Sequence, residues 1–199
     1  MPGSLLKRSS PSRAGSDLSE AGLLELIRSG DPSGMRLFYE RYAGYLTAVC
    51  SRYVPDRAEV KDILQDCFVK MFGSLDKFEY RGEGSLKAWA ARIVVNGSLK
   101  ALAASSRLKF VDDLPDTPDD DGDLGTLPDV PAAVVQEMIK ALPDGYRTVF
   151  NLFVFEKKSH REIAALLGIK EDSSASQFFR ARAMLAKQIK NWIKEHDNG

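Results

Sequence analysis

The chain has 199 residues, of which 44% are hydrophobic and 28% charged, and its 28 basic and 28 acidic side chains balance. This is the composition of a globular protein of one domain or two small ones, and no apolar run approaches the roughly 18 residues that a membrane span requires. Residues 1–16 include basic groups but no apolar core, so we expect a disordered N-terminal tail rather than a signal peptide.

The balanced charge conceals an acidic segment. Residues 111–131 contain eight aspartates and no basic residue, so the other 178 residues hold 28 basic against 20 acidic groups, a net charge of +8. The segment has too few large apolar side chains to fold alone. It is predicted to be a flexible linker between domains at 17–110 and 132–199. Both domains have helical rather than alternating periodicity, so the predicted fold class is all-α.

The first domain is predicted to contain four helices around one core. The candidate N-caps are Ser19, Asp31, Asp56 and Ser85. The first helix should end at Gly30 and the second at Pro55, because glycine and proline often end helices. The expected inner faces carry Leu23, Leu24 and Ile27; Met35, Phe38, Tyr42, Leu46, Val49 and Tyr53; Val60, Ile63, Leu64, Cys67, Phe68, Met71 and Phe72; and Leu86, Trp89, Ile93, Leu99 and Leu102.

The second domain is predicted to begin with helices at 134–142 and 144–157. Ser159 and Glu162 then fit a capping box, Gly168 suits a sharp turn through positive φ, and Ser173 is a candidate cap for a last helix. The expected inner faces carry Ile163, Leu166 and Leu167, then Phe178, Ala181, Leu185 and Ile189. From residue 178 to 194 there are five basic residues and no acid.

This spacing favours a DNA-binding helix-turn-helix. Its second helix would present four side chains to base edges: Ser174, Ala175, Gln177 and Phe179. Phosphates would meet Arg180, Arg182 and the helix start at Ser173. The alternative is an ordinary helical hairpin with a solvated basic face.

Catalysis has little support, because no P-loop, GxGxxG, GxSxG or HExxH motif occurs. Cys50 and Cys67 each lie in an apolar helical pattern and are expected to be buried free thiols. His160 and His196 have no partners for metal or nucleophilic chemistry. We therefore expect no enzyme activity and no cofactor.

Four segments resemble bacterial RNA polymerase sigma factors of the extracytoplasmic-function (ECF) type: DILQDCFVKMF (62–72), RGEGSLKAWAARIVVN (81–96), ALPDGYRTVFNLFVFEKKSHREIAALLGI (141–169) and SQFFRARAML (176–185). The similarity covers roughly residues 22–110 and 132–190 in order. It implies a cytoplasmic transcription initiation factor that binds core RNA polymerase and directs it to the −10 and −35 promoter elements. It also implies an anti-sigma factor as a partner, and no direct insertion into the membrane.

The resemblance assigns roles to residues of the first domain. Glu59, Asp62, Gln65 and Asp66 share one face of a helix and match the surface that docks on the polymerase; the alternative is a solvated helix face. The −10 pocket would comprise Tyr80, Arg81 and Glu83. Four further residues could follow the DNA strand: Asn96, Lys100, Arg107 and Lys109. Trp89 is expected in the core.

Two stretches depart from the family pattern, and several alternatives stay open. The helix after Asn96 reads GSLKALAASSR, with alanines where the family commonly carries basic or polar groups, and Gly97 also weakens it. In the last helix, Ala175 stands where a basic residue is frequent. The acidic linker could act in the nucleic-acid channel of the polymerase or serve only as a tether. The rival functions are a helix-turn-helix regulator that binds DNA without polymerase and an all-helical enzyme.

Overall fold

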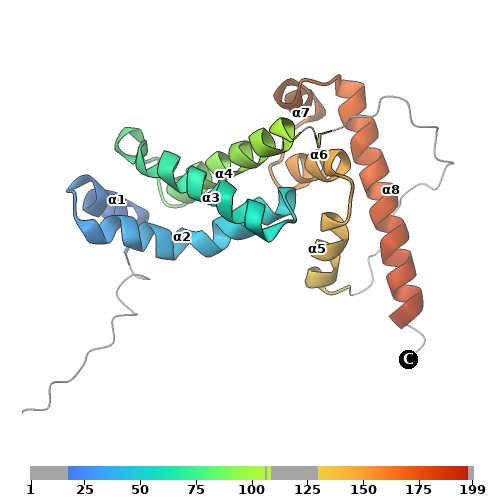
Figure 1. The fold of residues 1–199 in the computed structure, drawn as a ribbon, viewed down its shortest axis with the longest axis horizontal. Helices are drawn as coiled ribbons and strands as arrows, with labels where there is room; N and C mark the ends of the chain where they lie inside the picture. Colours follow the sequence, from blue (N-terminus) through green and yellow to red (C-terminus); the bar gives the residue numbers. More distant parts are fainter. Residues whose placement is uncertain (1–17, 106, 109–129, 197–199) are drawn as a thin grey trace, which may run out of the picture.

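The computed structural model describes residues 18–105, 107–108 and 130–196, and every regular element within these ranges is helical (Figure 1). The expected all-α fold with two helical parts is therefore confirmed. The predicted N-terminal tail and most of the predicted linker lie outside the described residues.

The first part contains four α-helices and one short 3-10 helix: α1 (Glu20–Arg28), α2 (Pro32–Tyr53), α3 (Arg57–Phe72), η1 (Leu75–Lys77) and α4 (Ser85–Ala104). Three of the predicted caps are confirmed. Ser19 Oγ accepts from Gly22 N at 3.1 Å, Asp31 Oδ1 from Ser33 N at 2.8 Å, and Asp56 Oδ1 from Glu59 N at 2.8 Å.

The prediction that Ser85 caps α4 is wrong. Ser85 is the first residue of the helix, and Gly84 precedes it with φ 89°. The free backbone N–H groups are satisfied from α1 instead: the Glu20 carboxylate accepts from Leu86 N at 2.9 Å and from Lys87 N at 3.0 Å. Glu20 is 2% exposed and also accepts from the Tyr42 hydroxyl at 2.8 Å. A carboxylate from the first residue of α1 therefore fixes where α4 begins.

Most of the predicted apolar faces of the first part form its core. Met35 is an exception: it is 36% exposed, because its place on α2 lies beside the stripe that runs through Phe38 and Tyr42. Helices α3 and α4 approach closely at Gly97, where an added Cβ would lie 2.6 Å from Cys67 Sγ. The glycine that sequence propensity disfavours is thus needed for packing.

The second part contains α5 (Ala132–Lys140), α6 (Asp144–Val154), α7 (His160–Leu167) and α8 (Glu171–His196). The predicted bounds need correction. The helix expected at 134–142 begins and ends two residues earlier, and the one expected to reach residue 157 ends at Val154, after which the chain turns at Lys157 with φ 55°. Leu166 is 42% exposed, whereas Ala164 is buried in its place.

The turn between α7 and α8 has the expected geometry. The Ser159–Glu162 capping box is complete, and Gly168 adopts φ 67°. However, α8 begins at Glu171, so Ser173 lies inside the helix and does not cap it.

The two parts are in contact. Helices α5 and α6 pack against α2 near its C-terminal end (Figure 1). The larger apolar cluster also includes Val149, Leu152 and Ile163 of the second part. Among the described helices, none has the length and apolar character to cross a membrane.

Candidate functional site

The outer face of α3 carries most of the predicted polymerase-binding set. Its inner face is held in the core by residues such as Ile63 and Phe68, which turns Asp62, Gln65 and Asp66 outward, where all three are exposed. Glu59 differs, because it is half-buried and forms an ion pair with Arg107. The structure therefore brings three of the four side chains together on open surface.

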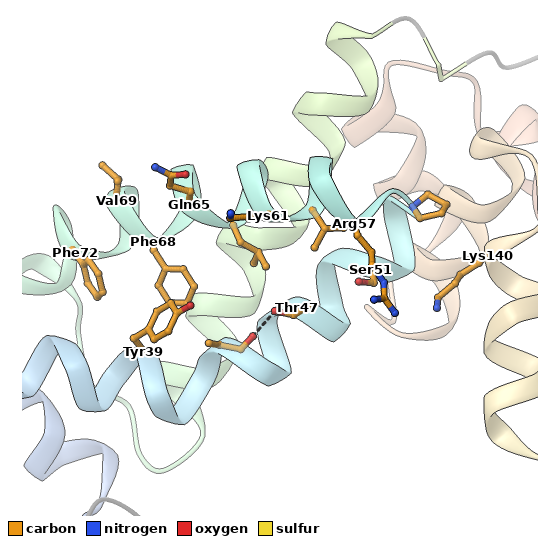
Figure 2. A pocket seen from close by; sticks show the side chains of 14 residues that line it. Tyr39, Thr47, Ser51, Arg57, Lys61, Gln65, Phe68, Val69, Phe72 and Lys140 are labelled. Carbon is orange, nitrogen blue, oxygen red and sulfur yellow. Dashed lines mark hydrogen bonds between the residues drawn. The ribbon is translucent and has the colours of Figure 1, made fainter.

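A groove of about 810 Å³ runs between α2 and α3 beside this face (Figure 2). Its apolar half is formed by Tyr39, Phe68 and Phe72, with the Tyr39 and Phe68 ring centroids 4.9 Å apart. Basic side chains lie toward its other end: Arg57, Lys61 and Lys140.

Sequence reasoning missed Tyr39 and Val69, which are 53% and 68% exposed. Both are apolar residues placed off the inner stripe of an amphipathic helix, and this position is a usable signal of a binding surface. Gln65 lines the same groove, so the groove is continuous with the predicted docking face.

The loop before α4 is organised by Glu83. Its carboxylate accepts from Glu20 N at 3.1 Å and pairs with Arg41 at 3.3 Å. Its bond with the Tyr80 hydroxyl is 3.4 Å long. Glu83 therefore holds the loop against α1 and α2. The residue predicted to line a base-binding pocket thus has a structural role in this loop.

Tyr80 and Arg81 are the accessible members of this loop. Tyr80 is 39% exposed, and Arg81 pairs with Glu79 at 3.2 Å while most of its side chain stays in solvent. Desolvation and then the Glu83 carboxylate raise the pKa of Tyr80 above its ordinary value. Trp89 packs against the core and Phe78, with ring centroids 5.1 Å apart, as expected.

The predicted strand-following residues divide into two groups. Asn96 and Lys100 are exposed one turn apart on α4, and Arg92, which sequence reasoning missed, is exposed one turn earlier. Arg92, Asn96 and Lys100 are spaced i, i+4 and i+8, which places them on one helix face, so the sequence alone could have indicated Arg92. Arg107 instead pairs with Glu59 and lies 3.8 Å from Asp144 Oδ2. Lys109 lies outside the described residues.

The helix-turn-helix presents a different set of side chains than predicted. Ser174 and Gln177 are buried, because they share the packed face of α8 with Phe178 and Ala181. Ser174 Oγ shares a hydrogen bond of 3.0 Å with His160 Nδ1, and Phe178 packs on Phe153 with ring centroids 4.4 Å apart. Neither Ser174 nor Gln177 can reach a base edge from this face.

The outward face of α8 carries the remaining predicted residues. Ala175, Phe179 and Arg182 are exposed, and Phe179 has 47% of its surface in solvent. Ser173 and Arg180 are half-buried. Ser176, which sequence reasoning did not select, is exposed beside Ala175. An exposed aromatic ring on a basic helix suits contact with DNA.

Metal binding has no candidate site in the described ranges. No group of three His, Cys, Asp or Glu side chains there is arranged to hold a metal ion. Cys50 and Cys67 are buried free thiols, as expected.

Comparison with known proteins identifies both parts. Residues 38–108 match the family model of Sigma-70 region 2, and residues 132–185 match that of Sigma-70 region 4. The ECF RNA polymerase sigma-E factor of Haemophilus influenzae is 29% identical over 184 residues, covering 86% of this chain and 96% of its own. That of Escherichia coli K12 is 27% identical over 189 residues, covering 89% and 97%.

Among solved structures, the sigma factor RpoE in complex with the anti-sigma factor NepR, from Bartonella quintana, is 20% identical with a TM-score of 0.46, covering 77% of this chain and 96% of its own. The two family matches span more than half of the chain and are in the order of the two helical parts. The chain therefore belongs to the sigma-70 family, as an RNA polymerase sigma factor of the ECF type.

Proposed function

We propose that this chain binds core RNA polymerase through the outer face of α3 and directs it to promoters by contacts at the −10 and −35 elements. The observation that carries the proposal is the exposed row of Asp62, Gln65 and Asp66 beside an apolar groove. Carboxylates aligned on a helix suit a partner surface with arginines, and the groove supplies apolar area to bury.

Co-elution with bacterial core RNA polymerase in size-exclusion chromatography tests the docking face. Asp66→Arg reverses the charge at the C-terminal end of the row and should abolish co-elution. Asp76→Arg is the matched control, because Asp76 is also exposed but lies on η1, outside the row. Equal co-elution of both variants would contradict the proposed face.

For the −10 element, we propose that Tyr80 and Arg81 contact an unstacked base and that Arg92, Asn96 and Lys100 follow the DNA strand. Support comes from their exposure on one loop and one helix face, and from an aromatic ring at the loop, which suits base stacking. Permanganate footprinting of promoter melting by the reconstituted holoenzyme tests this. Tyr80→Ala should reduce melting while leaving polymerase binding intact.

For the −35 element, we propose contacts from the outward face of α8: Ala175, Ser176, Phe179, Arg180 and Arg182. The observation that supports this is the exposed aromatic and basic surface there. A DNA shift assay with and without polymerase is informative about the rival function. A sigma factor should bind a promoter well only with core enzyme, whereas a free-standing regulator should bind alone.

We further propose that the chain acts in the cytoplasm, that the domains are 17–110 and 132–199 with 111–131 as linker, and that an anti-sigma factor controls it. The groove between α2 and α3 offers such an inhibitor a surface that overlaps the docking face through Gln65. An inhibitor bound there should compete with core polymerase, which a competition co-elution measures.

A further inference from the structure

The starts of α1 and α4 cap each other. The Glu83 carboxylate, in the loop before α4, accepts from Glu20 N, the first N–H group of α1, at 3.1 Å. The buried Glu20 carboxylate in turn accepts from Leu86 N at 2.9 Å and from Lys87 N at 3.0 Å, both in α4. The N–H groups at a helix start have no partner within the helix, and negative charge is favourable near them. Each helix is therefore capped by an acid that lies at or next to the start of the other.

Arg41 of α2 ties these two helix starts together from a third element. Its Nη2 donates to Glu83 Oε1 at 3.3 Å, and its Nη1 donates to Leu18 O, just before α1, at 2.5 Å. One guanidinium therefore joins the entry of α1 to the loop before α4. The Arg41 and Glu83 side chains are 30% and 57% exposed, so this ion pair lies at the surface, next to the loop that carries Tyr80.

The loop at 78–84 takes its shape from contacts with other elements. Gly82 and Gly84 adopt φ 111° and 89°, and glycine reaches positive and negative φ about equally readily, so the backbone alone does not select one loop shape. At the first residue of the loop, Arg28 of α1 donates from Nη2 to Phe78 O at 2.5 Å. Helix α1 therefore holds the loop near both of its ends, at Phe78 and through the bond to the Glu83 carboxylate.

The two side chains proposed to meet the −10 element are attached to this fixed part of the loop. Ser85 Oγ accepts from Arg81 N at 3.2 Å and donates to Gly82 O at 2.6 Å, which sets the backbone at Arg81. The Tyr80 hydroxyl donates to Glu83 Oε2 at 3.4 Å, the same oxygen that caps α1. Tyr80 and Arg81 are both exposed, so they combine a fixed attachment with open access.

We propose that Arg41 and Glu83 are positioning residues for the −10 contact: their ion pair holds Tyr80 and Arg81 in the binding shape before DNA arrives, and selection among −10 bases depends on it. The proposal rests on the proposed −10 contact of Tyr80 and Arg81. A loop that is already in its binding shape loses less conformational freedom on binding, and it rejects a wrong base rather than adapting to it. Helix α1 takes part in this although it precedes residues 38–108, which match Sigma-70 region 2.

The test variant is Arg41→Gln in the full chain, which removes the charge that faces Glu83. Arg36→Gln is the matched control, because Arg36 is exposed on the same helix. Neither arginine lines the groove between α2 and α3, so both variants should bind core polymerase equally. If circular dichroism finds Arg41→Gln unfolded, Glu83→Gln replaces it, because this variant breaks the same ion pair and keeps an oxygen that can accept from Glu20 N.

The assay measures base discrimination by holoenzyme reconstituted with bacterial core RNA polymerase. The unchanged chain first selects a promoter from a DNA library randomised at the −35 and −10 elements. Each −10 position is then changed to every other base, and the discrimination is the ratio of open complexes on the best and worst base. Tyr80→Ala identifies the positions that the loop reads. There, Arg41→Gln should lower the ratio by about three- to fivefold, the factor by which a partly exposed ion pair can bias an equilibrium, and Arg36→Gln should leave it unchanged. A variant that is only less stable forms fewer open complexes on every promoter and keeps the ratio.

A double-mutant cycle shows whether the two residues act through each other. Arg41→Gln combined with Glu83→Gln should lower the ratio no further than Glu83→Gln alone, and fully additive effects would overturn the role of the ion pair. If a folded Arg41→Gln keeps the ratio at positions where Tyr80→Ala changes it, the positioning is overturned and the −10 contact stands. If Tyr80→Ala changes the ratio at no position, the proposed −10 contact fails and its positioning fails with it.

Discussion

Glu20 offers the sharpest test of how the first part is assembled. Its buried carboxylate accepts hydrogen bonds from the Tyr42 hydroxyl, Leu86 N and Lys87 N, which belong to α2 and α4. Glu20→Ala removes the acceptor and leaves three donors without partners. An unsatisfied buried donor costs about 1–3 kcal/mol, and water can reach the half-buried Lys87 N–H, so the expected loss of stability is about 3–5 kcal/mol.

This loss is large against the roughly 5–15 kcal/mol of a typical domain. Glu20→Gln should cost less, about 1–3 kcal/mol, because an oxygen is retained but the amide nitrogen faces donors. Urea unfolding followed by far-UV circular dichroism measures both values. Amide hydrogen exchange adds a local measurement, in which Leu86 and Lys87 should lose their protection.

Glu25→Ala is the matched control, since Glu25 is exposed on the same helix, and it should change stability by less than about 0.5 kcal/mol. The reasoning would be refuted if Glu20→Ala were as stable as this control, or if Leu86 and Lys87 kept their protection. Either result would mean that Glu20 does not cap α4.

Three further predictions concern packing, ionisation and the DNA-binding helix. Gly97→Ala should destabilise the chain by about 1–2 kcal/mol despite the better helix propensity of alanine, because the new Cβ would meet Cys67 Sγ at 2.6 Å. In a Cys67→Ala background the same substitution should stabilise the chain. A double-mutant cycle of unfolding free energies checks this. Burial raises the pKa of Cys67 from 9.0 to about 11 and raises that of Tyr42 as well, so the folded state binds these protons more tightly than the unfolded chain. The stability that these groups contribute should therefore be complete below pH 9 and fall as the pH rises toward 11. An alkaline titration in which stability increased would contradict this. Phe179→Ala should weaken −35 binding by the holoenzyme and leave the melting temperature of the chain unchanged, because Phe179 is exposed. Gln177→Ala should lower the melting temperature, because Gln177 is buried. The opposite pattern would mean that the two faces of α8 are exchanged.

Local sequence signals predicted much of this fold. Ser19, Asp31 and Asp56 cap their helices through bonds to N–H groups two or three residues away, and the Ser159–Glu162 box is equally local. Such bonds depend on residue type and spacing alone, which a sequence provides. The caps that were missed come from far along the chain.

Glu20 caps α4 across 66 residues and Arg147 caps α2 across 94, so no local pattern could indicate either. The error at Ser174 and Gln177 was avoidable. Both lie on the stripe that continues from Phe178 and Ala181 toward the helix start, and that stripe was already assigned to the interior. The stripe includes Ser174 because the helix starts at Glu171, two residues before the predicted cap at Ser173.

The close approach of α3 and α4 at Gly97 and Cys67 has a mechanical consequence. At this point α4 has no side chain of its own and lies directly against the Cys67 and Ile63 side chains of α3. Sliding or tilting of α4 on α3 would cause a steric clash in such a close-packed contact, so we expect the two helices to move as one rigid body. A partner that fixes the orientation of α3 thereby fixes the direction of Arg92, Asn96 and Lys100 on α4. The free energy of docking on one helix would then be converted into alignment of the other, with no conformational change needed in between.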